Sequence, residues 1–364
     1  MNTSSKRLLS LDILRGLTVF GMILVNNGAG HEHFSTLVHS AWNGLTPCDL
    51  VFPFFLFMVG VSIPMSSKTA LAPVFWRSVK MFALGVALHA WDMWIWGAED
   101  ILSNLRVWGV LERIALCYLA VSVFHYYAKR YQWSVKVLWC SVVSLLAGYA
   151  IVLLWGNGYE QDETNIAYII DRALVGEAHL YHKSAIDPEG LLGTFPSIAH
   201  TLIGLYVGLL MKEKRALAER LIRLFTLSSL LLVVGYLLSY GLPLNKRIWS
   251  PSYVLVTCGL ASALLALLIR RVDEQVDPFA HPQRPSLWCR PFLWFGSNAI
   301  ALYVCSEMLA PVMGLMGVGD AMSQTLIGMG FTPQWASLCY ALSFDLLMAL
   351  IAWGLYVRKI FIKL

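Results

Sequence analysis

The chain carries little charge for its length. It has 364 residues, of which 58% are hydrophobic and only 13% are charged, and its mean hydropathy is +0.63. Average globular chains contain about 25% charged residues, so this chain has too few charged residues for the surface of a soluble protein. The composition predicts an integral membrane protein and excludes a disordered, collagen-like or coiled-coil chain. The net charge of +5 gives no support to nucleic-acid binding, because it is better explained by membrane topology.

Ten apolar segments are long enough to cross about 30 Å of hydrocarbon as helices, which takes roughly 20 residues each. They run approximately over residues 10–27, 47–66, 74–94, 107–127, 135–155, 191–211, 221–241, 250–270, 291–314 and 335–357. No repeat or linker separates them, and one polar excursion covers residues 156–190. We therefore expect an all-α, polytopic helix bundle of about ten transmembrane helices in a single domain over residues 1–364.

The first apolar segment has a second interpretation. Lys6 and Arg7 precede the run LTVFGMILV, an order that also occurs in cleaved signal peptides. Asp12 is out of place in such a positive leader. Removing the segment would also reverse the charge alternation at the amino end. We therefore expect the segment to remain as a membrane helix.

The basic residues predict the orientation. Of the 27 Lys and Arg residues, 20 fall at the two termini and in alternate loops. The opposite loops contain five: Arg106, Arg172, Lys183, Lys246 and Arg247. Short cytoplasmic loops retain Lys and Arg, so we expect both termini to be cytoplasmic and the poorly basic loops to face outward.

The first outward loop and its flanks hold the richest polar set, in the stretch VNNGAGHEHFSTLVHSAWNGLTPCDLVFPFFLF. The set comprises Asn26, Asn27, His31, His33, His39, Trp42, Asn43 and Asp49. The HEH spacing fits neither an HExxH helix nor a facial triad, so we expect no metal. A single loop histidine is often merely solvated. Asp49 either orients His39 or caps the second apolar helix.

Few ionisable residues fall inside the apolar segments. Asp12 and Arg15 lie three apart on one helix face, a spacing that suits an intrahelical ion pair. Glu112 and Arg113 are adjacent and point about 100° apart, so at least one should face the bundle interior. No P-loop or GxGxxG motif is present, so a phosphate-bearing cofactor would be held by helix ends and basic side chains.

An ordered series of motifs runs nearly from end to end of the chain. The series is SLDILRG (10–16), ILVNNG (23–28), HSAWNGLTPCDLVFPFFLFMVGVSI (39–63), NLRVWGVLERIALCY (104–118), DPEGLLGTFPSI (187–198), PLNKRIWSPSYVL (243–255), SNAIALYVCSEML (297–309) and VRKIFIKL (357–364). It resembles the transmembrane family of heparan-alpha-glucosaminide N-acetyltransferase. A single matching block would be weak evidence for this family, whereas the order of the blocks and the HxxWNGLTxxDLVFPFF core are specific to it.

The resemblance implies transfer of an acetyl group from cytosolic acetyl-CoA to the amine of a terminal glucosamine-type sugar on the far side of the membrane. The family's outer histidine and asparagine match His39 and Asn26. We expect His39 to act as the general base and the Asn26 amide to stabilise the oxyanion, with Asp49 orienting His39 or the sugar amine. The residues leave open a transient acetyl-histidine, although we prefer direct transfer.

Further site residues follow from the resemblance and the expected topology. The candidates for acetyl-CoA binding are Arg15, Arg113, Asn298 and Glu307, with the nucleotide near Lys68, Arg77, Lys129 and Arg130. Arg15 and Arg113 are equally compatible with structural pairing to Asp12 or Glu307. The candidates for sugar binding are Trp42, Asn43, Asn104, Asp187, Glu189, Asn245 and Lys246.

The chain departs from the family pattern at two residues. Residue 112 is Glu where Gln is usual, and residue 306 is Ser where animal members tend to have His beside the match to Glu307. The large lumenal amino-terminal region of the lysosomal enzymes is not in this sequence. We therefore expect a bacterial inner-membrane protein with His39 toward the periplasm. The expected partners are acetyl-CoA, an amino sugar, the lipid bilayer and a second copy in a homodimer, and not nucleic acid.

Two other functions fit a polar path through ten helices. One is an amino-sugar permease, against which stands the lack of an inverted repeat or of paired broken helices in the sequence. The other is an O-acetyltransferase of cell-envelope glycans, which would use similar histidine chemistry. A structural scaffold would not account for the outer polar cluster.

Overall fold

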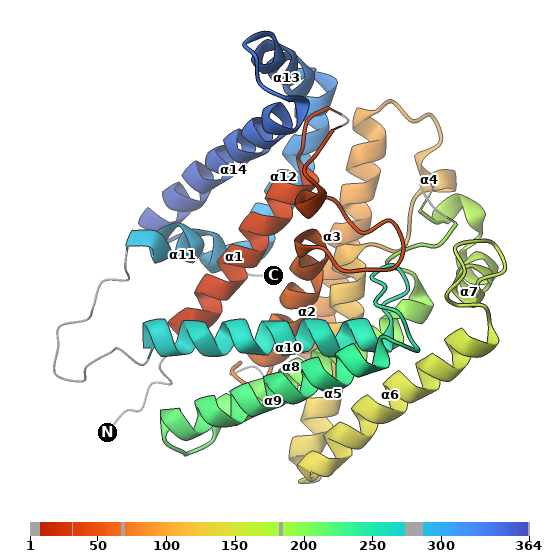
Figure 1. The fold of residues 1–364 in the computed structure, drawn as a ribbon, viewed down its shortest axis with the longest axis vertical. Helices are drawn as coiled ribbons and strands as arrows, with labels where there is room; N and C mark the ends of the chain where they lie inside the picture. Colours follow the sequence, from red (N-terminus) through yellow and green to blue (C-terminus); the bar gives the residue numbers. More distant parts are fainter. Residues whose placement is uncertain (1–7, 31, 67–69, 182–184, 274–286, 363–364) are drawn as a thin grey trace. The chain divides into compact units, whose positions relative to one another are not determined.

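The computed structural model describes residues 8–30, 32–66, 70–181, 185–273 and 287–362, and the regular structure of these residues is entirely helical (Figure 1). Seven helices in this part of the chain are long and apolar enough to cross a membrane. They are α1 (Leu9–Asn26), α3 (Leu71–Ile95), α6 (Val135–Trp155), α8 (Leu191–Lys212), α9 (Leu217–Leu238), α10 (Pro251–Leu268, continued by a π-turn to Asp273) and α14 (Pro333–Val357). The prediction of a polytopic helical membrane protein is confirmed.

The remaining three expected segments are also helical, but each departs from a single straight span. Helix α2 (Val51–Ser62) follows a 3₁₀ turn at Pro47–Leu50 and is short. Helix α5 (Val110–Arg130) carries Glu112 and Arg113 and is not among the seven. The ninth segment is divided into α11 (Arg290–Ser297) and α12 (Ala299–Leu315), which meet at 84°. The count of ten spans stays a prediction.

Asn298 accounts for the bend between α11 and α12. Its backbone is non-helical, with φ −131° and ψ 36°. Its side-chain amide donates to the carbonyl of Ile360 at 2.9 Å and accepts from the amide of Ile362 at 2.9 Å. The side chain of Asn298 therefore holds the carboxy-terminal segment at the break.

Three shorter helices lie outside the ten expected segments. They are α4 (Ile101–Asn104), α7 (Ile166–Val175) and α13 (Val318–Gly328). Helix α7 occupies the polar excursion and begins with an N-cap, since the Asn165 side chain accepts from the amide of Ala167 at 2.9 Å. The excursion is therefore an ordered, helix-containing loop.

The chain divides into two compact units. The first comprises Met1–Val38, Arg215–Thr226 and Ala261–Lys363, and in it α1 packs on α11 while α13 packs on α14. The second comprises His39–Lys214 and Leu227–Leu260, and in it α2 packs on α8 and α3 packs on α5. The single domain expected from the sequence stays a prediction.

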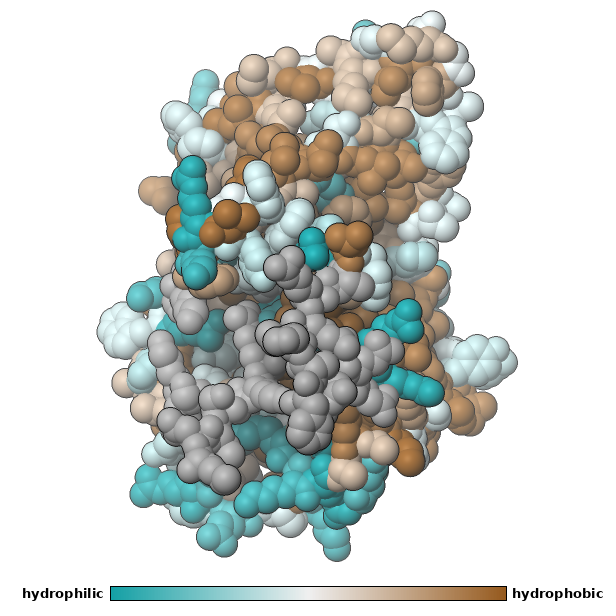
Figure 2. All heavy atoms as spheres, turned by 90° about the vertical axis from the view of Figure 1, so that its left-hand side faces the viewer, coloured by the Kyte–Doolittle hydropathy of each residue, from teal (hydrophilic) through white to brown (hydrophobic). Residues whose placement is uncertain are grey.

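The charged residues inside the helices behave as their spacing predicts. The Arg15 Nη1 atom lies 3.4 Å from Asp12 Oδ1, so the intrahelical pair is confirmed. Glu112 and Arg113 are each only 1% exposed. Apolar side chains dominate much of the surface instead, as the brown areas of Figure 2 show for one face. Exposed examples on α14 include Trp335, Leu346, Leu350 and Trp353, as expected of helices that meet lipid.

Glycines allow α2 and α8 to approach closely. A Cβ atom on Gly60 of α2 would lie 2.1 Å from the carbonyl oxygen of Thr201 on α8. A Cβ atom on Gly204 of α8 would lie 2.2 Å from the carbonyl oxygen of Phe57 on α2. Small residues at a membrane helix interface permit this backbone contact. Helix α2, which begins two residues after Asp49, is thereby held tightly against α8.

Replacing Gly204 with Ala is expected to lower the unfolding free energy by about 1–3 kcal/mol, because the added methyl group collides with a backbone atom. The matched control is Gly148→Ala on α6, where an added Cβ meets nothing within 4 Å. That control should be neutral or stabilising, because Ala is the better helix former. Thermal unfolding in detergent measures both variants. Equal melting temperatures for the two would contradict the close-packing argument.

Candidate active site

His39 and Asp49 form a hydrogen-bonded pair at the amino-terminal end of α2. His39 Nδ1 lies 2.8 Å from Asp49 Oδ1, and because the ionised carboxylate only accepts, the ring nitrogen is the donor. The His39 side chain is 46% exposed, whereas that of Asp49 is fully buried. This bond leaves Nε2 as the nitrogen with a lone pair. The pair thus presents a potential base at an exposed position.

The local sequence determines where Asp49 lies. Thr46 is the N-cap of the turn Pro47–Leu50, and Thr46 and Asp49 form a reciprocal capping box. Asp49 Oδ2 accepts from the Thr46 amide at 3.1 Å, the Thr46 hydroxyl at 3.0 Å and the Ser40 amide at 3.2 Å. Together with His39, four donors surround this carboxylate. Asp49 therefore caps the turn and holds His39 at the same time.

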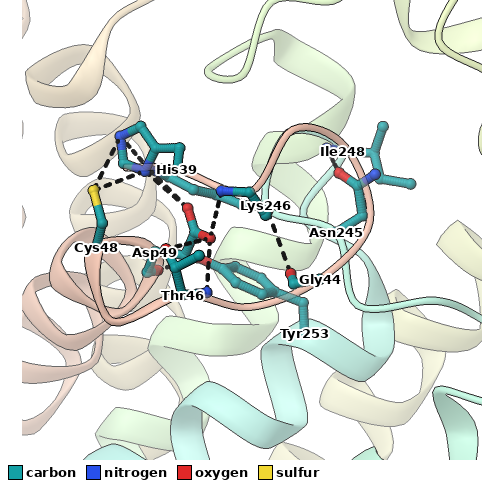
Figure 3. Close-up of polar contacts among 10 residues, drawn as sticks. His39, Gly44, Thr46, Cys48, Asp49, Asn245, Lys246, Ile248 and Tyr253 are labelled. Atoms are coloured by element: carbon teal, nitrogen blue, oxygen red, sulfur yellow. Dashed lines mark hydrogen bonds and ion pairs between the residues drawn. The ribbon is translucent and has the colours of Figure 1, made fainter. Parts of the chain in front are cut away.

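Lys246 lies directly beside His39 in the same unit, as Figure 3 shows. Its Nζ atom is 3.0 Å from Nδ1 and 3.1 Å from Nε2 of the ring, and 3.8 Å from Asp49 Oδ1. Burial lowers the pKa of Lys246 below its usual value, although the negative charges of Asp49 and Glu189 oppose this shift. From its sequence position, Lys246 is expected only to bind sugar.

Cys48 also lies at this ring, with Sγ 3.0 Å from Nδ1 of His39. Cys48 is not among the site residues expected from the sequence. The side chain is 3% exposed, and it is one of seven free cysteines in the described part of the chain. Its position one residue before Asp49 was the available signal.

Two hydrogen bonds between loops hold Lys246 beside His39. The Gly44 amide donates to the Leu244 carbonyl at 2.8 Å, and Asn245 Nδ2 donates to Asn43 Oδ1 at 3.1 Å. Asn245 is completely buried, and its Oδ1 also accepts from the Ile248 amide at 3.2 Å. The loop between α9 and α10 is therefore docked on the loop that carries His39.

Trp249 shapes the same loop. Its φ of +53° lies in the left-handed region, which is unusual for a large side chain. The ring is 1% exposed and packs edge-to-face on Phe52 at 5.1 Å and on Tyr253 at 5.3 Å. Tyr253 in turn donates from its hydroxyl to the Asp49 carbonyl at 2.6 Å. Packing in the core thus maintains a strained backbone next to the His39 pair.

A second ionic cluster closes the polar excursion. Arg106 donates to Asp187 through Nε at 3.1 Å and through Nη2 at 2.6 Å, and Nη2 also lies 2.7 Å from Glu189 Oε2. Asp187 further accepts from the backbone amides of Tyr181 and Glu189. The Arg106 guanidinium also covers the Tyr181 ring at 4.7 Å. These contacts give Asp187 a structural role in the loop.

Replacing Arg106 with Leu is expected to lower the unfolding free energy by about 3–5 kcal/mol, because two nearly buried carboxylates lose their partner. The matched control is Arg172→Leu, since Arg172 pairs with Glu177 at 3.3 Å where both side chains are more than half exposed. The loss there should stay below about 1 kcal/mol. Chemical denaturation in detergent compares the two, and an Arg106 variant as stable as the control would refute the structural role.

Arg113 is anchored within the second unit. Its Nη2 atom donates to the Gly190 carbonyl at 2.8 Å, and its guanidinium lies 5.2 Å from the centre of the Trp249 ring. Glu112, next to it, has its carboxylate in the space left by Gly85 and Gly109, 4.0 Å from His89 Nε2. Binding of acetyl-CoA by Arg113 stays a prediction.

The other selected residues are distributed over both units. In the second unit, Trp42 donates from Nε1 to the Tyr159 carbonyl at 2.7 Å, while Asn43 and Asn104 are exposed. In the first unit, Asn26 is exposed at the end of α1, and Glu307 is half-buried on α12. The pairing of Asn26 with His39 and the sugar- and cofactor-binding roles stay predictions. His31, Lys68 and Lys183 lie outside the described residues.

No metal centre is seen in the part of the chain that the structure describes. None of its His, Cys, Asp and Glu side chains form a group of three or more that is arranged to hold an ion. The arrangement at His39 instead combines a base, a buried carboxylate and an amine. These groups suit proton transfer and nucleophilic substitution at a carbonyl.

Comparison with known proteins confirms the resemblance. The family model described as heparan-alpha-glucosaminide N-acetyltransferase, catalytic, matches residues 7–240, which is more than half of the chain. The mouse heparan-alpha-glucosaminide N-acetyltransferase is 28% identical over 378 residues, covering 84% of this chain and 54% of the relative. The human protein of that name is 29% identical over 373 residues, covering 83% and 53%. The chain spans about half the length of these curated relatives, and it belongs to the heparan-alpha-glucosaminide N-acetyltransferase catalytic family.

Proposed function

We propose that the protein is a transmembrane N-acetyltransferase that moves an acetyl group from acetyl-CoA to the amine of a glucosamine-type sugar. The observation that carries the proposal is the exposed His39, bonded to the buried Asp49 and leaving Nε2 free of the carboxylate. Membership in the family supports the reaction class. The names of the two relatives support a glucosamine-containing acceptor.

In the proposed reaction the thioester carbonyl is already activated, so the protein must supply a neutral amine nucleophile. His39 Nε2 takes a proton from the sugar amine as the amine nitrogen attacks the carbonyl carbon of the thioester. Asp49 keeps the ring in the tautomer with hydrogen on Nδ1 and stabilises the imidazolium that forms. As the C–S bond breaks, the proton passes from His39 to the CoA sulfur.

Asn26 is proposed to donate its side-chain amide to the oxyanion of the tetrahedral intermediate. Replacing Asn26 with Ala should lower kcat about 10²–10³-fold, the usual cost of losing one oxyanion donor. Steady-state kinetics measure the rate, and equilibrium binding of acetyl-CoA should be retained. An unchanged kcat would remove Asn26 from the mechanism.

The proposed topology follows the basic residues. The two termini and the CoA nucleotide lie on the cytoplasmic side of a bacterial inner membrane, and His39 faces the periplasm. This arrangement would carry the acetyl group across the membrane without moving CoA. A homodimer stays a prediction.

Purified protein in sealed liposomes tests the proposal. Acetyl-CoA is supplied on the side of the termini and glucosamine on the other, and N-acetylglucosamine and free CoA are measured. Formation of both products in equal amounts is expected. Sugar flux without CoA release would instead identify a permease, and a hydroxylamine-sensitive ester product would identify an O-acetyltransferase.

A further inference from the structure

Lys246 places an amine where the proposed reaction needs one. Its Nζ atom lies 3.0 Å from Nδ1 and 3.1 Å from Nε2 of His39, so it is almost equally close to the nitrogen that faces Asp49 and to the one that does not. A general base must lie about 2.6–3.2 Å from the atom whose proton it removes. The Lys246 amine therefore lies within proton-transfer distance of this base.

This position is built into the fold. The Lys246 side chain is only 14% exposed, and the loop that carries it is bonded to the His39 loop at both Gly44 and Asn43. Tertiary contacts thus hold the amine at the base before any ligand arrives. Such positioning can supply a large part of the rate of a reaction between two groups held in one site.

The charge state of the amine is compatible with nucleophilic attack. Burial lowers the pKa of Lys246 from its usual value, and so does the nearby charge of Arg247. Asp49, Glu189 and Cys48 act in the opposite direction without restoring the usual pKa. A larger share of Lys246 is therefore neutral near physiological pH than of a solvated lysine.

We propose that Lys246 is a self-acetylation site, at which the acetyl group of the thioester donor is transferred to Nζ when no acceptor sugar is bound. The proposal rests on the proposed function, because it uses the same donor and the same base. The neutral amine attacks the carbonyl carbon, the N–C bond forms and the C–S bond breaks. The proton lost by nitrogen passes to His39 Nε2 and then to the sulfur of the released thiol.

Acetylation would change the site lastingly. The amide product is far less reactive than a thioester, so the acetyl group stays on Lys246. The modification removes a positive charge 3.8 Å from Asp49 and fills the space beside His39. An acceptor sugar would compete with Lys246 for that space and protect it, so the modification marks enzyme that is supplied with donor but not with acceptor.

Peptide mass spectrometry of the purified full-length protein tests the inference. The protein is incubated with acetyl-CoA, with or without glucosamine, and acetylation of Lys246 is followed over time. The exposed Lys136 and Lys214 in the same unit report the uncatalysed reaction. The variants His39→Ala and His39→Gln report the contribution of the base.

Acetylation of Lys246 is expected to be about 10²-fold faster than that of Lys136 and Lys214. Glucosamine should slow it, and both His39 variants should lose it. If Lys246 stays unmodified without glucosamine, in a preparation that acetylates glucosamine when the sugar is added, the proposed function stands but the inference is overturned. Equal labelling of Lys246 in wild type and both variants would also overturn it. If neither Lys246 nor glucosamine is acetylated, both proposals fail.

Discussion

Replacing His39 with Ala is expected to abolish acetyl transfer while leaving acetyl-CoA binding intact. The only proton acceptor proposed for the amine is lost, a change that costs about 10²–10⁴-fold in rate. The rest of the site should remain, because the capping box of Thr46 and Asp49 forms without His39. The measurements are kcat with glucosamine and equilibrium binding of labelled acetyl-CoA.

The matched control is His33→Ala in the same outward stretch of sequence. His33 Nδ1 lies 2.7 Å from the Ser337 hydroxyl, in the first unit, and has no role in the proposed reaction. This variant should retain transfer. Wild-type turnover in the His39 variant would refute the proposed base, whereas loss of turnover in both variants would point to misfolding of the loop.

Replacing Asp49 with Asn is expected to lower kcat about 10²-fold or more and also to destabilise the fold. The amide has no charge to stabilise the imidazolium, and its NH₂ group would face donors that now bond a carboxylate. The unfolding free energy should fall by about 1–3 kcal/mol, because buried donors lose their acceptor. Kinetics and thermal unfolding measure the two effects separately.

Thr46→Ala distinguishes the two roles of Asp49. It removes the hydroxyl bond to Asp49 and the side-chain half of the capping box but leaves the His39–Asp49 bond in place. The cost in stability should be about 1 kcal/mol, with kcat close to that of wild type. If Asp49→Asn and Thr46→Ala lower kcat equally, Asp49 acts only as a cap.

Short-range patterns account for most of the helices and for part of the site. Twenty-residue apolar runs become helices in a membrane because each backbone polar group must be paired within its own segment. The pairing of Asp12 with Arg15 follows from helix geometry alone. His39 and Asp49 are ten residues apart, and the threonine cap between them makes their contact a local event.

Contacts between residues far apart in the sequence could not be predicted from the sequence patterns. The break at Asn298 depends on bonds to Ile360 and Ile362, more than 60 residues away, so residues 291–314 alone read as one span. Helices α7 and α13 have only 10 and 11 residues, too few for the span-length criterion that found the others.

The membrane class follows from the small number of charged residues, and the helical segments follow from the length of the apolar runs. Both can be read from the sequence because, in lipid, every segment must pair its backbone polar groups internally. The neighbourhood of His39 does not follow in this way. Lys246 is 207 residues away along the chain and reaches the ring through the buried Asn245 and the strained Trp249. Only the packing of one loop on another decides that an amine lies beside this base, since such contacts leave no periodic pattern in either loop.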